Sequence, residues 1–441
     1  MSILDAKRLD PKVFCLDQRM RHGYYSDQYF LNLRQILTAL ADEGYRFRGR
    51  SPIAPELDLG AGGLDVGNIE VEMQVFAKRE PFTVACGVDN AIAILKQCTG
   101  WLDESGAFRS TAPSLEVEAV LDGAKVAPWA PALKVRGRYR DFAILETTIL
   151  GVLARQSRVA TNTYRLLEAA GGKPVFFFPA RYDLPATQSA DGYAYKVGVD
   201  RYNLDTGRSL PAMITTQAQG EWWAGRGSGT MSHSYVLSFL GDCAQSMLQF
   251  ARLLPPEVKR VALVDTDNDV VRDSLCTANA MWANYRTLLA RGDRGEAEKY
   301  RLFGVRCDTA VEVRDVSVEP TGDPRLDNGV TPQLVNKLRR ALDGLATGGD
   351  VAEAERDEAR RYFQGIRIVV SGGFDCERIA WFESLGVPVD IYGVGSSFLT
   401  TGHNDFTADV VRVKVGGRWV HMAKVGRRAM PNPDLVPVPM G

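Results

Sequence analysis

The sequence predicts a mixed α/β protein. A parallel α/β region, as a barrel or an open sheet, is expected beside an α+β region with an antiparallel sheet. Short apolar runs recur between helical patterns across residues 131–400, as in parallel strands buried on both faces. Residues 68–75 alternate polar and apolar side chains, as in a half-buried strand. The 441 residues allow two or three domains of about 150 residues each.

Charge and composition exclude several classes of protein. The 53 Lys and Arg residues are balanced by 54 Asp and Glu residues, so the chain lacks a basic field for nucleic acid. No apolar run reaches the roughly 18 residues of a membrane span, and the N-terminus lacks the apolar core of a signal peptide. Seven scattered cysteines and four histidines favour a reduced, cytoplasmic chain without a zinc site.

The first predicted domain covers residues 1–135. An aromatic-rich stretch at residues 24–40 has the pattern of a helix, and the alternating strand at 69–75 follows it. Ile69, Val71 and Met73 are expected on the buried face of that strand. The pattern therefore predicts an α+β domain with an antiparallel sheet.

The second predicted domain covers residues 136–400. Thr331 followed by Pro332 predicts the start of one helix, and Asp375 is expected to cap another. Residues 310–330 and 346–362 are polar and long for α/β connections, so they are expected to be surface insertions. The apolar runs that we interpret as buried strands lie at 174–178, 261–264, 302–305, 366–370 and 389–392.

The last predicted segment, residues 401–441, contains two alternating runs around Gly416 and Gly417. Adjacent glycines between such runs indicate a two-residue hairpin turn. We expect these C-terminal strands to return to the sheet of the N-terminal domain.

Two glycine-rich loops follow consecutive predicted strands near the end of the parallel region. Glycine lets backbone N–H groups approach a ligand, and the N-terminus of a following helix favours an anion. In (β/α) barrels the loops after the last two strands commonly form a phosphate site. The sequence therefore predicts phosphate binding here, with tight strand-to-helix turns as the simpler alternative. The loop residues are Ser371, Gly372, Gly373, Gly393, Gly395 and Ser396.

Acidic residues follow two further strands. Asp265, Asp267 and Asp269 come just after the run at 261–264, and Arg306 and Asp308 end the run at 302–305. Carboxylates at the carboxyl ends of parallel strands suit ribose hydroxyls or a magnesium–phosphate complex. Asp265 and Asp267 are the candidates for Mg²⁺, and helix capping is the alternative for these acids.

His233 and Arg181 are candidates of other kinds. His233 lies in the loop GSGTMSHSYV, whose small polar neighbours leave the imidazole accessible and supply hydrogen-bond partners. A structural histidine is the alternative. Arg181 follows the apolar run at 174–178, where a guanidinium suits a carboxylate or a phosphate.

Five motifs occur together in one order: LETTILGVL, GTMSHSYV, GVRCDT, VVSGGFD and GVPVDIYGVGSS. With them the chain resembles the nicotinate phosphoribosyltransferase family over most of its length. The resemblance implies a type II phosphoribosyltransferase fold, an irregular (β/α) barrel with an α+β sandwich domain formed by the N-terminal region and the C-terminal strands. It also implies transfer of phosphoribose from phosphoribosyl pyrophosphate to nicotinate, which yields nicotinate mononucleotide and pyrophosphate in NAD salvage.

The resemblance also implies roles for the catalytic residues. His233 matches the histidine that ATP phosphorylates in this family, so ATP is expected as co-substrate together with Mg²⁺. Arg306 and Asp308 match an Arg-x-Asp motif beside the base and the ribose. The glycine loops at 371–373 and 393–396 match those that hold the phosphates.

The substrate contacts are carried over in the same way. Thr230, Ser234 and Arg181 are expected to contact the substrates. Tyr29 matches an aromatic residue that stacks on nicotinate from a neighbouring subunit, which implies a homodimer with shared active sites.

The chain departs from the family pattern at several positions. Tyr182 and Leu184 stand where members often have a second basic residue and a histidine, and Thr309 follows the Arg-x-Asp motif in place of serine. Base specificity therefore stays open. A related phosphoribosyltransferase for nicotinamide or quinolinate is one alternative, and a catalytically silent paralogue that binds a nucleotide is another.

Overall fold

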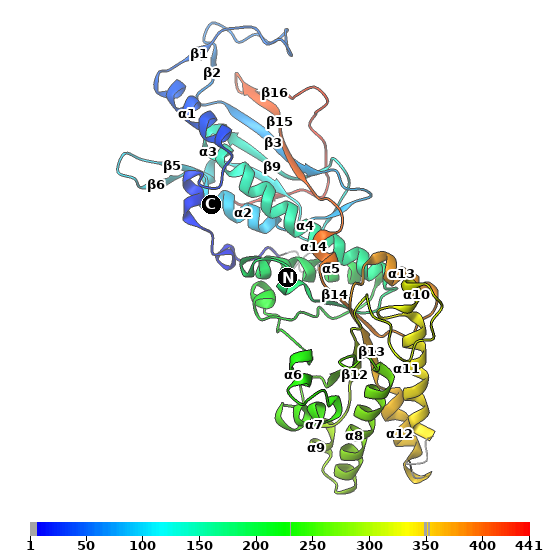
Figure 1. The fold of residues 1–441 in the computed structure, drawn as a ribbon. Helices are drawn as coiled ribbons and strands as arrows, with labels where there is room; N and C mark the ends of the chain where they lie inside the picture. The colour runs from blue at the N-terminus through cyan, green and yellow to red at the C-terminus, as the bar shows by residue number, and fades with distance from the viewer. Residues whose placement is uncertain (1–6, 230, 348–350, 352) are drawn as a thin grey trace. The chain divides into compact units, whose positions relative to one another are not determined.

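The computed structural model describes residues 7–229, 231–347, 351 and 353–441, which divide into two compact units (Figure 1). The first unit comprises the described residues up to Tyr164, together with Ser189–Gly207 and Thr401–Gly441. The second comprises Arg165–Gln188 and Arg208–Thr400. The sequence prediction divides the chain at residues 135 and 400, whereas the first unit continues to Tyr164 and takes in a later segment.

A six-stranded antiparallel sheet lies at the centre of the first unit, in the order β16-β15-β3-β9-β7-β17. Strand β3 lies between β9 and β15, so a C-terminal strand pairs with an N-terminal one (Figure 1). The strands are β3 (Glu70–Ala77), β7 (Glu116–Ala119), β9 (Pro131–Arg138), β15 (Phe406–Val415), β16 (Arg418–His421) and β17 (Val436–Val438).

The hairpin expected in the C-terminal segment joins β15 to β16. Gly416 and Gly417 lie between the paired strands, with φ of 54° and 78°. Both values are in the left-handed region, which a two-residue hairpin turn of the right twist requires and which glycine adopts without steric cost.

Helices cover one face of this sheet and complete a hydrophobic core. Val71 and Met73 of β3 belong to the same buried cluster as Ile92 and Leu95 of helix α2. Removing this apolar surface from water is the main force that stabilises the unit. The longer helices that lie wholly or mostly in this unit are α1 (Gln28–Asp42), α2 (Val88–Cys98), α4 (Glu146–Ala169) and α5 (Gln188–Thr206), with the short α3 (Tyr139–Phe142) before α4.

The strand predicted at residues 69–75 is β3. The prediction that it is half-buried is wrong, because both faces of β3 are covered. Glu72 is fully buried, and its carboxylate accepts hydrogen bonds from Arg136 and Arg412 at 2.7 and 3.0 Å. Gln74 exchanges two hydrogen bonds with the backbone of the C-terminal segment 428–430. The alternation of the sequence therefore marks an ion-paired face rather than a solvated one.

The second unit contains a five-stranded parallel sheet in the order β10-β14-β13-β12-β11. Each of the five apolar runs forms one of these strands, so the prediction of a parallel α/β region is confirmed. The strands are β10 (Val175–Phe177), β11 (Val261–Leu263), β12 (Gly304–Cys307), β13 (Arg367–Val370) and β14 (Ile391–Val394).

The closed barrel that the resemblance implies is not confirmed. Strands β10 and β11 form the two edges of the described sheet and do not pair with each other there. An isolated parallel bridge joins Phe177 to Ile214 beyond β10, so the sheet is extended on that side by a segment too irregular to form a strand. The described pairings therefore make an open parallel sheet.

Helices connect the parallel strands, and two of their predicted caps are present. Thr331 Oγ1 accepts from the N–H of Leu334 at 3.2 Å, and Asp375 Oδ1 accepts from the N–H of Arg378 at 2.8 Å. The helices are α6 (His233–Leu237), α7 (Cys243–Leu253), α8 (Val270–Ala290), α9 (Arg294–Lys299), α10 (Pro324–Asp327), α11 (Pro332–Gly344), α12 (Arg356–Gln364), α13 (Cys376–Ser384) and α14 (Ser397–Thr400). Among the described helices, none has the length and apolar character that a membrane crossing requires.

The two segments expected to be surface insertions are partly buried, which corrects that prediction. In residues 310–330, Asp315 is fully buried and accepts from the N–H of Val270, where α8 begins. In the other segment, Tyr362 of α12 is buried and its ring packs on Trp282 of α8. The polar composition of a segment does not show which of its residues are buried and attach it to the rest of the protein.

Glu146, the first residue of α4, gives the first unit a testable pH dependence. Burial, and then the charges of Asp409 and Asp27, raise the pKa of its carboxyl from 4.5 to about 8. Folding therefore favours the protonated form. The stabilising contribution is complete below pH 4.5 and is lost as the pH rises to about 8.

Urea unfolding between pH 5 and 9 checks this prediction. We expect the free energy of unfolding to fall over that range by up to a few kcal/mol, at about 1.4 kcal/mol per unit of pKa shift. Glu146→Gln removes one titrating group and should make the profile less steep; Asp122, whose pKa burial also raises to about 8, remains. Glu43→Gln, at an exposed acid after α1, should leave the profile unchanged. An equal slope in the wild type and Glu146→Gln would contradict the prediction.

Candidate active site

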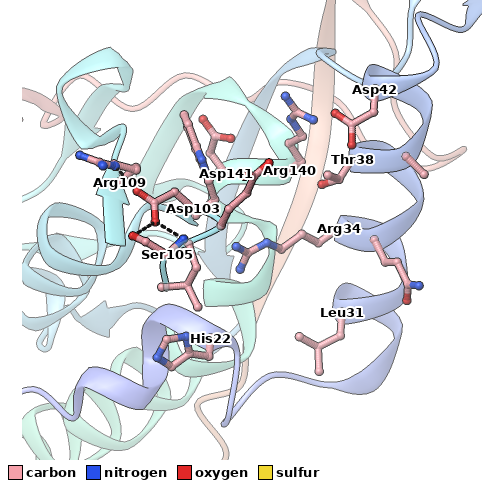
Figure 2. Close-up of a pocket in the computed structure, with 15 residues that line it drawn as sticks. His22, Leu31, Arg34, Thr38, Asp42, Asp103, Ser105, Arg109, Arg140 and Asp141 are labelled. Carbon is pink, nitrogen blue, oxygen red and sulfur yellow. Dashed lines mark hydrogen bonds and ion pairs between the residues drawn. The ribbon is translucent and has the colours of Figure 1, made fainter. Parts of the chain in front are cut away.

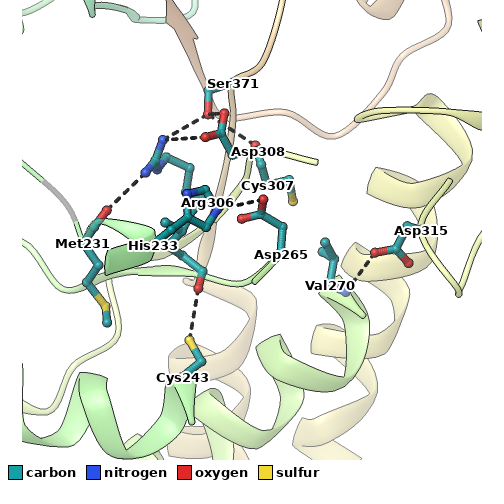
Figure 3. A network of polar contacts seen from close by, with 11 residues as sticks. Met231, His233, Cys243, Asp265, Val270, Arg306, Cys307, Asp308, Asp315 and Ser371 are labelled. Atoms are coloured by element: carbon teal, nitrogen blue, oxygen red, sulfur yellow. Dashed lines mark hydrogen bonds and ion pairs between the residues drawn. The ribbon is translucent and has the colours of Figure 1, made fainter. Parts of the chain in front are cut away.

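The candidate site lies in the second unit, where three adjacent strands end (Figure 3). Asp265 follows β11, Arg306 belongs to β12 with Asp308 just after it, and Ser371 follows β13. Adjacent parallel strands end at the same edge of a sheet, so residues from distant parts of the sequence meet there. The site is thus a consequence of the strand order.

The guanidinium of Arg306 is at the centre of a polar network. Its Nη2 donates to the carbonyl oxygen of Met231 at 3.1 Å, and its Nη1 lies 3.4 Å from Asp308 Oδ2 and 3.3 Å from Ser371 Oγ. The hydroxyl of Ser371 donates to Asp308 Oδ1 at 2.7 Å. The Arg306 side chain is only 12% exposed, so this network holds a cation in a mostly dry site.

His233 and Asp265 form a second pair at the same edge. Ser232 caps α6 by accepting from the N–H of Tyr235, which places His233 at the first position of that helix. His233 Nε2 lies 3.0 Å from Asp265 Oδ2. The imidazole is 43% exposed, whereas the carboxyl is 6% exposed. Burial raises the pKa of Asp265, and His233 opposes that rise. A buried carboxylate therefore orients an accessible imidazole.

Asp267 and Asp269, the other two acids that follow β11, do not contact this pair. Asp267 forms an ion pair with Arg272, and Asp269 caps α8 by accepting from the N–H of Arg272 at 3.1 Å. The capping alternative is therefore confirmed for Asp269. The structure brings only Asp265 to His233.

A magnesium site made of protein ligands alone is not present among the described residues, which contain no group of three or more His, Cys, Asp or Glu side chains placed to hold a metal. Mg²⁺ is commonly held by one or two carboxylates together with phosphate and water oxygens. Asp265 Oδ1 is buried and has no hydrogen-bond partner among the described residues, and the carboxyl of Asp308 is 26% exposed. These two carboxylates fit a magnesium–phosphate complex.

The loop after β13 has the backbone that its glycines allow. Gly372 and Gly373 have φ of 88° and 72°, in the left-handed region. Arg378 Nη1 donates to the carbonyl oxygen of Gly372 at 2.8 Å, which fixes the loop from the side of α13. Ser371 at the start of this loop is engaged with Asp308, as described above.

The second glycine loop differs from its prediction, because Gly393 lies inside strand β14. A Cβ atom at Gly393 would lie 2.6 Å from Phe178 Cε2, and one at Gly395 would lie 2.7 Å from Tyr182 Cε2. Aromatic rings packed on the backbone therefore require both glycines. The Phe178 ring centre is 5.9 Å from the Arg306 guanidinium carbon.

Sequence reasoning missed Phe178 and Tyr182 as parts of the site. The available signal was the aromatic string FFFPARY at the end of β10, the strand that pairs with β14. Arg181 follows β10 in the same string; it is exposed, with its guanidinium carbon 5.7 Å from the Tyr182 ring centre.

Gly393→Ala tests this packing. We expect a loss of about 1–3 kcal/mol in the free energy of unfolding, because the new methyl group overlaps the Phe178 ring. Gly151→Ala is the matched control: nothing lies within 4 Å of a Cβ at that helical position, so the change should be neutral or stabilise by about 0.5–1 kcal/mol. Urea unfolding of both variants provides the measurement, and equal stabilities would contradict the prediction.

The remaining predicted residues of the second unit have few contacts. Ser234 Oγ lies 2.8 Å from Ser232 Oγ, on the exposed side of α6. Ser396 is exposed, and its carbonyl oxygen accepts from the N–H of Leu399 as α14 begins. Thr230 lies outside the described residues.

Tyr29, the predicted stacking residue, belongs to α1 of the first unit and is 60% exposed. Its ring packs on Phe30, with the ring centres 4.3 Å apart. The start of α1 is joined to the start of α4, because Thr147 Oγ1 donates to Asp27 Oδ2 at 2.9 Å. An exposed aromatic ring is thus presented from a fixed helix end.

The fold defines the class of this protein: a mixed α/β protein of the type found in nicotinate and quinolinate phosphoribosyltransferases. Residues 58–157 match the family model described as "Quinolinate phosphoribosyl transferase, N-terminal domain". A nicotinate-nucleotide pyrophosphorylase from Pyrococcus furiosus is similar with a TM-score of 0.62 and 24% identity, over 96% of this chain and 85% of that one. Human nicotinic acid phosphoribosyltransferase is similar with a TM-score of 0.53 and 19% identity, over 80% of this chain and 72% of that one.

Curated relatives agree with the motifs. A nicotinate phosphoribosyltransferase of Mycobacterium tuberculosis is 28% identical over 284 residues, which cover 64% of this chain and 48% of that protein. The human nicotinate phosphoribosyltransferase is 25% identical over 323 residues, which cover 68% of this chain and 55% of that protein. The chain thus spans about half the length of these relatives. Together the matches agree with the resemblance to the nicotinate phosphoribosyltransferase family that the motifs indicate.

Proposed function

We propose that the protein transfers phosphoribose from phosphoribosyl pyrophosphate to the ring nitrogen of nicotinate, as a cytoplasmic enzyme of NAD salvage. The observation that carries the proposal is the network of Arg306, Asp308 and Ser371 beside the His233–Asp265 pair. Relatives named nicotinate phosphoribosyltransferase support it. The five parallel strands are proposed to belong to an irregular (β/α) barrel.

Arg306 positions the anionic base in this proposal. A guanidinium that is mostly removed from water attracts a carboxylate more strongly than an exposed one does. Asp308 and Ser371 hold the Arg306 side chain in one orientation, and the Phe178 ring provides an apolar wall for a flat pyridine. Correct placement of the ring nitrogen against the ribose accounts for a large part of such a rate enhancement.

The phosphates are assigned to the loop at Ser371–Gly373 and to the loop that begins at Gly395. Asp265 or Asp308, together with the phosphates, would hold Mg²⁺, which would supply charge neutralisation for the departing pyrophosphate. The protein's own contribution is to fix the loop backbone through Arg378 and the Arg306 network.

His233 couples ATP hydrolysis to this transfer. Because Nε2 faces Asp265, Nδ1 is the proposed acceptor of the γ-phosphoryl group, and ADP leaves. Asp265 holds the proton on Nε2 and stabilises the positive charge that develops on the ring. The phosphate on His233 is later lost to water, and its charge is proposed to drive closure or product release.

The active assembly is proposed to be a homodimer. The exposed ring of Tyr29 is suited to stack on a base bound to a second copy of the chain, because stacking needs an accessible aromatic face.

The test is product formation from phosphoribosyl pyrophosphate and Mg²⁺ with nicotinate, nicotinamide or quinolinate, each with and without ATP. Nicotinate mononucleotide formation that ATP stimulates is the expected result, and Asp308→Asn should lower it strongly.

Quinolinate is the second candidate substrate. The family model for residues 58–157 is named for quinolinate phosphoribosyltransferase. Turnover of quinolinate with release of CO₂, and none of nicotinate, would replace the proposal by this one. Failure with all three bases would point to a silent paralogue.

A further inference from the structure

A cavity in the first unit contains none of the residues proposed for catalysis. It has a volume of about 1320 Å³ and lies between α1, α3 and the hairpin of β5 (Gly100–Leu102) and β6 (Phe108–Ser110) (Figure 2). A volume of this size exceeds the roughly 300–1,000 Å³ of most small-molecule sites. The cavity can therefore take a ligand of nucleotide size.

Two carboxylates of the cavity wall are already engaged by neighbours. Asp103 accepts from Arg109 Nε at 2.6 Å and from the hydroxyl of Ser105 (Figure 2). Asp141 accepts from Arg138 through both oxygens and from the hydroxyl of Thr111. Their charges are thus largely offset inside the protein.

Two guanidiniums of the same wall have no carboxylate within ion-pair distance among the described residues. Arg34 Nη1 donates only a long hydrogen bond, 3.5 Å, to the carbonyl oxygen of Arg21, and Arg140 Nη2 donates to the Asn68 side-chain oxygen at 3.0 Å. Figure 2 shows the Arg34 side chain extending from α1 into the cavity. Burial lowers the pKa of both arginines. A desolvated cation without a counter-ion is costly, and a bound anion would offset that cost.

The remaining acids of the wall compensate these cations only in part, since the charge of Asp42 acts on Arg140 without forming an ion pair. Asp42 and Glu104 are both exposed, so water and salt screen their charges. Neither comes within ion-pair distance of Arg34 or Arg140 in the part of the chain that the structure describes.

Trp101 adds an aromatic surface to the cavity. It lines the cavity and is 40% exposed. The Arg138 guanidinium carbon lies 5.3 Å from its ring centre, which steadies the indole. A partly exposed indole beside two cations suits a ligand with a planar ring and a phosphate, because bases stack on aromatic side chains and guanidiniums bind phosphate through paired hydrogen bonds.

We propose that this cavity is a second ligand site, which binds a nucleotide with its phosphate on Arg34 and Arg140 and its base against Trp101. The proposal is independent of the catalytic reaction, since it uses no residue of the Arg306 or His233 groups. A carboxylate metabolite would use the two arginines but not the indole, which favours a nucleotide over it.

Titration of the full chain with AMP, followed by calorimetry and tryptophan fluorescence, tests the proposal. We expect Arg34→Gln and Arg140→Gln each to raise Kd by about tenfold or more, equivalent to about 1.4 kcal/mol. Trp101→Ala should also weaken AMP binding, but should not weaken binding of inorganic phosphate. Arg109→Gln, at an exposed arginine of the same wall that pairs with Asp103, is the matched control and should stay within about twofold.

Several results would overturn the proposal. One is the absence of AMP binding at millimolar concentration. Another is AMP binding that Arg306→Ala abolishes but Arg34→Gln leaves intact. The third is equal affinity for AMP and inorganic phosphate. Arg34→Lys keeps the charge but loses the paired donors. An intermediate Kd in that variant, with an unchanged melting temperature, would separate loss of the ligand contact from loss of the fold.

Discussion

Replacement of Arg306 by alanine is expected to lower kcat/KM for nicotinate mononucleotide formation by about 10²–10³-fold, the range seen when one preorganised hydrogen-bond donor is lost from an active site. The physical reason is the number of elements that this side chain joins. It contacts the backbone of Met231 before α6, Asp308 after β12 and Ser371 after β13. Its removal takes away the cation of the base site and leaves the Asp308 carboxylate without its compensating charge.

Steady-state kinetics with each substrate varied in turn distinguishes binding from chemistry. We expect KM for nicotinate to rise most, because the guanidinium is assigned to the base. Arg306→Lys should recover only part of the loss, since an ammonium cannot reproduce the guanidinium geometry. Arg367→Ala is the matched control, at an exposed arginine at the other end of β13. A loss of less than about threefold in Arg306→Ala would remove Arg306 from the proposed mechanism.

The parallel sheet could be predicted because its signal is local. Strands buried on both faces are continuous apolar runs, and all five runs form strands. The covered polar face of β3 could not be predicted in this way. Glu72 and Gln74 have partners near residues 412 and 428–430, more than 300 positions away, and nothing near residue 70 indicates them.

Gly393 in β14 and Gly395 just after it show the same limit of prediction at the site. Gly393 and Gly395 have the spacing of a phosphate-binding loop. This spacing does not reveal the aromatic rings that leave no room for a side chain at either position. Phe178 and Tyr182 meet these glycines only because β10 and β14 are neighbours in the sheet. Glycine at a strand end is thus explained here by close approach of a side chain as well as by a turn.

The acidic string after β11 is a similar case at a finer scale. Asp265, Asp267 and Asp269 are similar by spacing, and the sequence offers Asp265 and Asp267 as magnesium ligands, with helix capping as the alternative for all three. Their contacts in the structure differ. Asp265 is nearly buried against His233, whereas Asp267 and Asp269 both contact Arg272 near the start of α8. Burial, which the sequence does not display, decides which of the three belongs to the site.

Because Asp265 alone of these three acids contacts His233, this pair gives the second prediction with a large expected effect. His233→Ala is expected to abolish the stimulation of product formation by ATP, so that the rates with and without ATP become equal while the ATP-free rate persists. Asp265→Asn keeps the shape of the pair but removes the charge that stabilises the protonated imidazole. We expect it to slow phosphorylation of His233 by about 10²–10⁴-fold, the usual range for loss of assistance to proton movement.

Transfer of label from γ-labelled ATP to the protein measures this step directly, with an acid-labile and alkali-stable bond as the signature of phosphohistidine. Asp269→Asn is the matched control, because it alters an acid of the same string that caps α8 and does not contact His233. Equal labelling of wild type and Asp265→Asn would show that the 3.0 Å contact between Asp265 and His233 is structural only. Labelling that persists in His233→Ala would place the phosphate on another residue. In either case the Arg306 network would remain as the basis for phosphoribose transfer, since its contacts do not pass through His233.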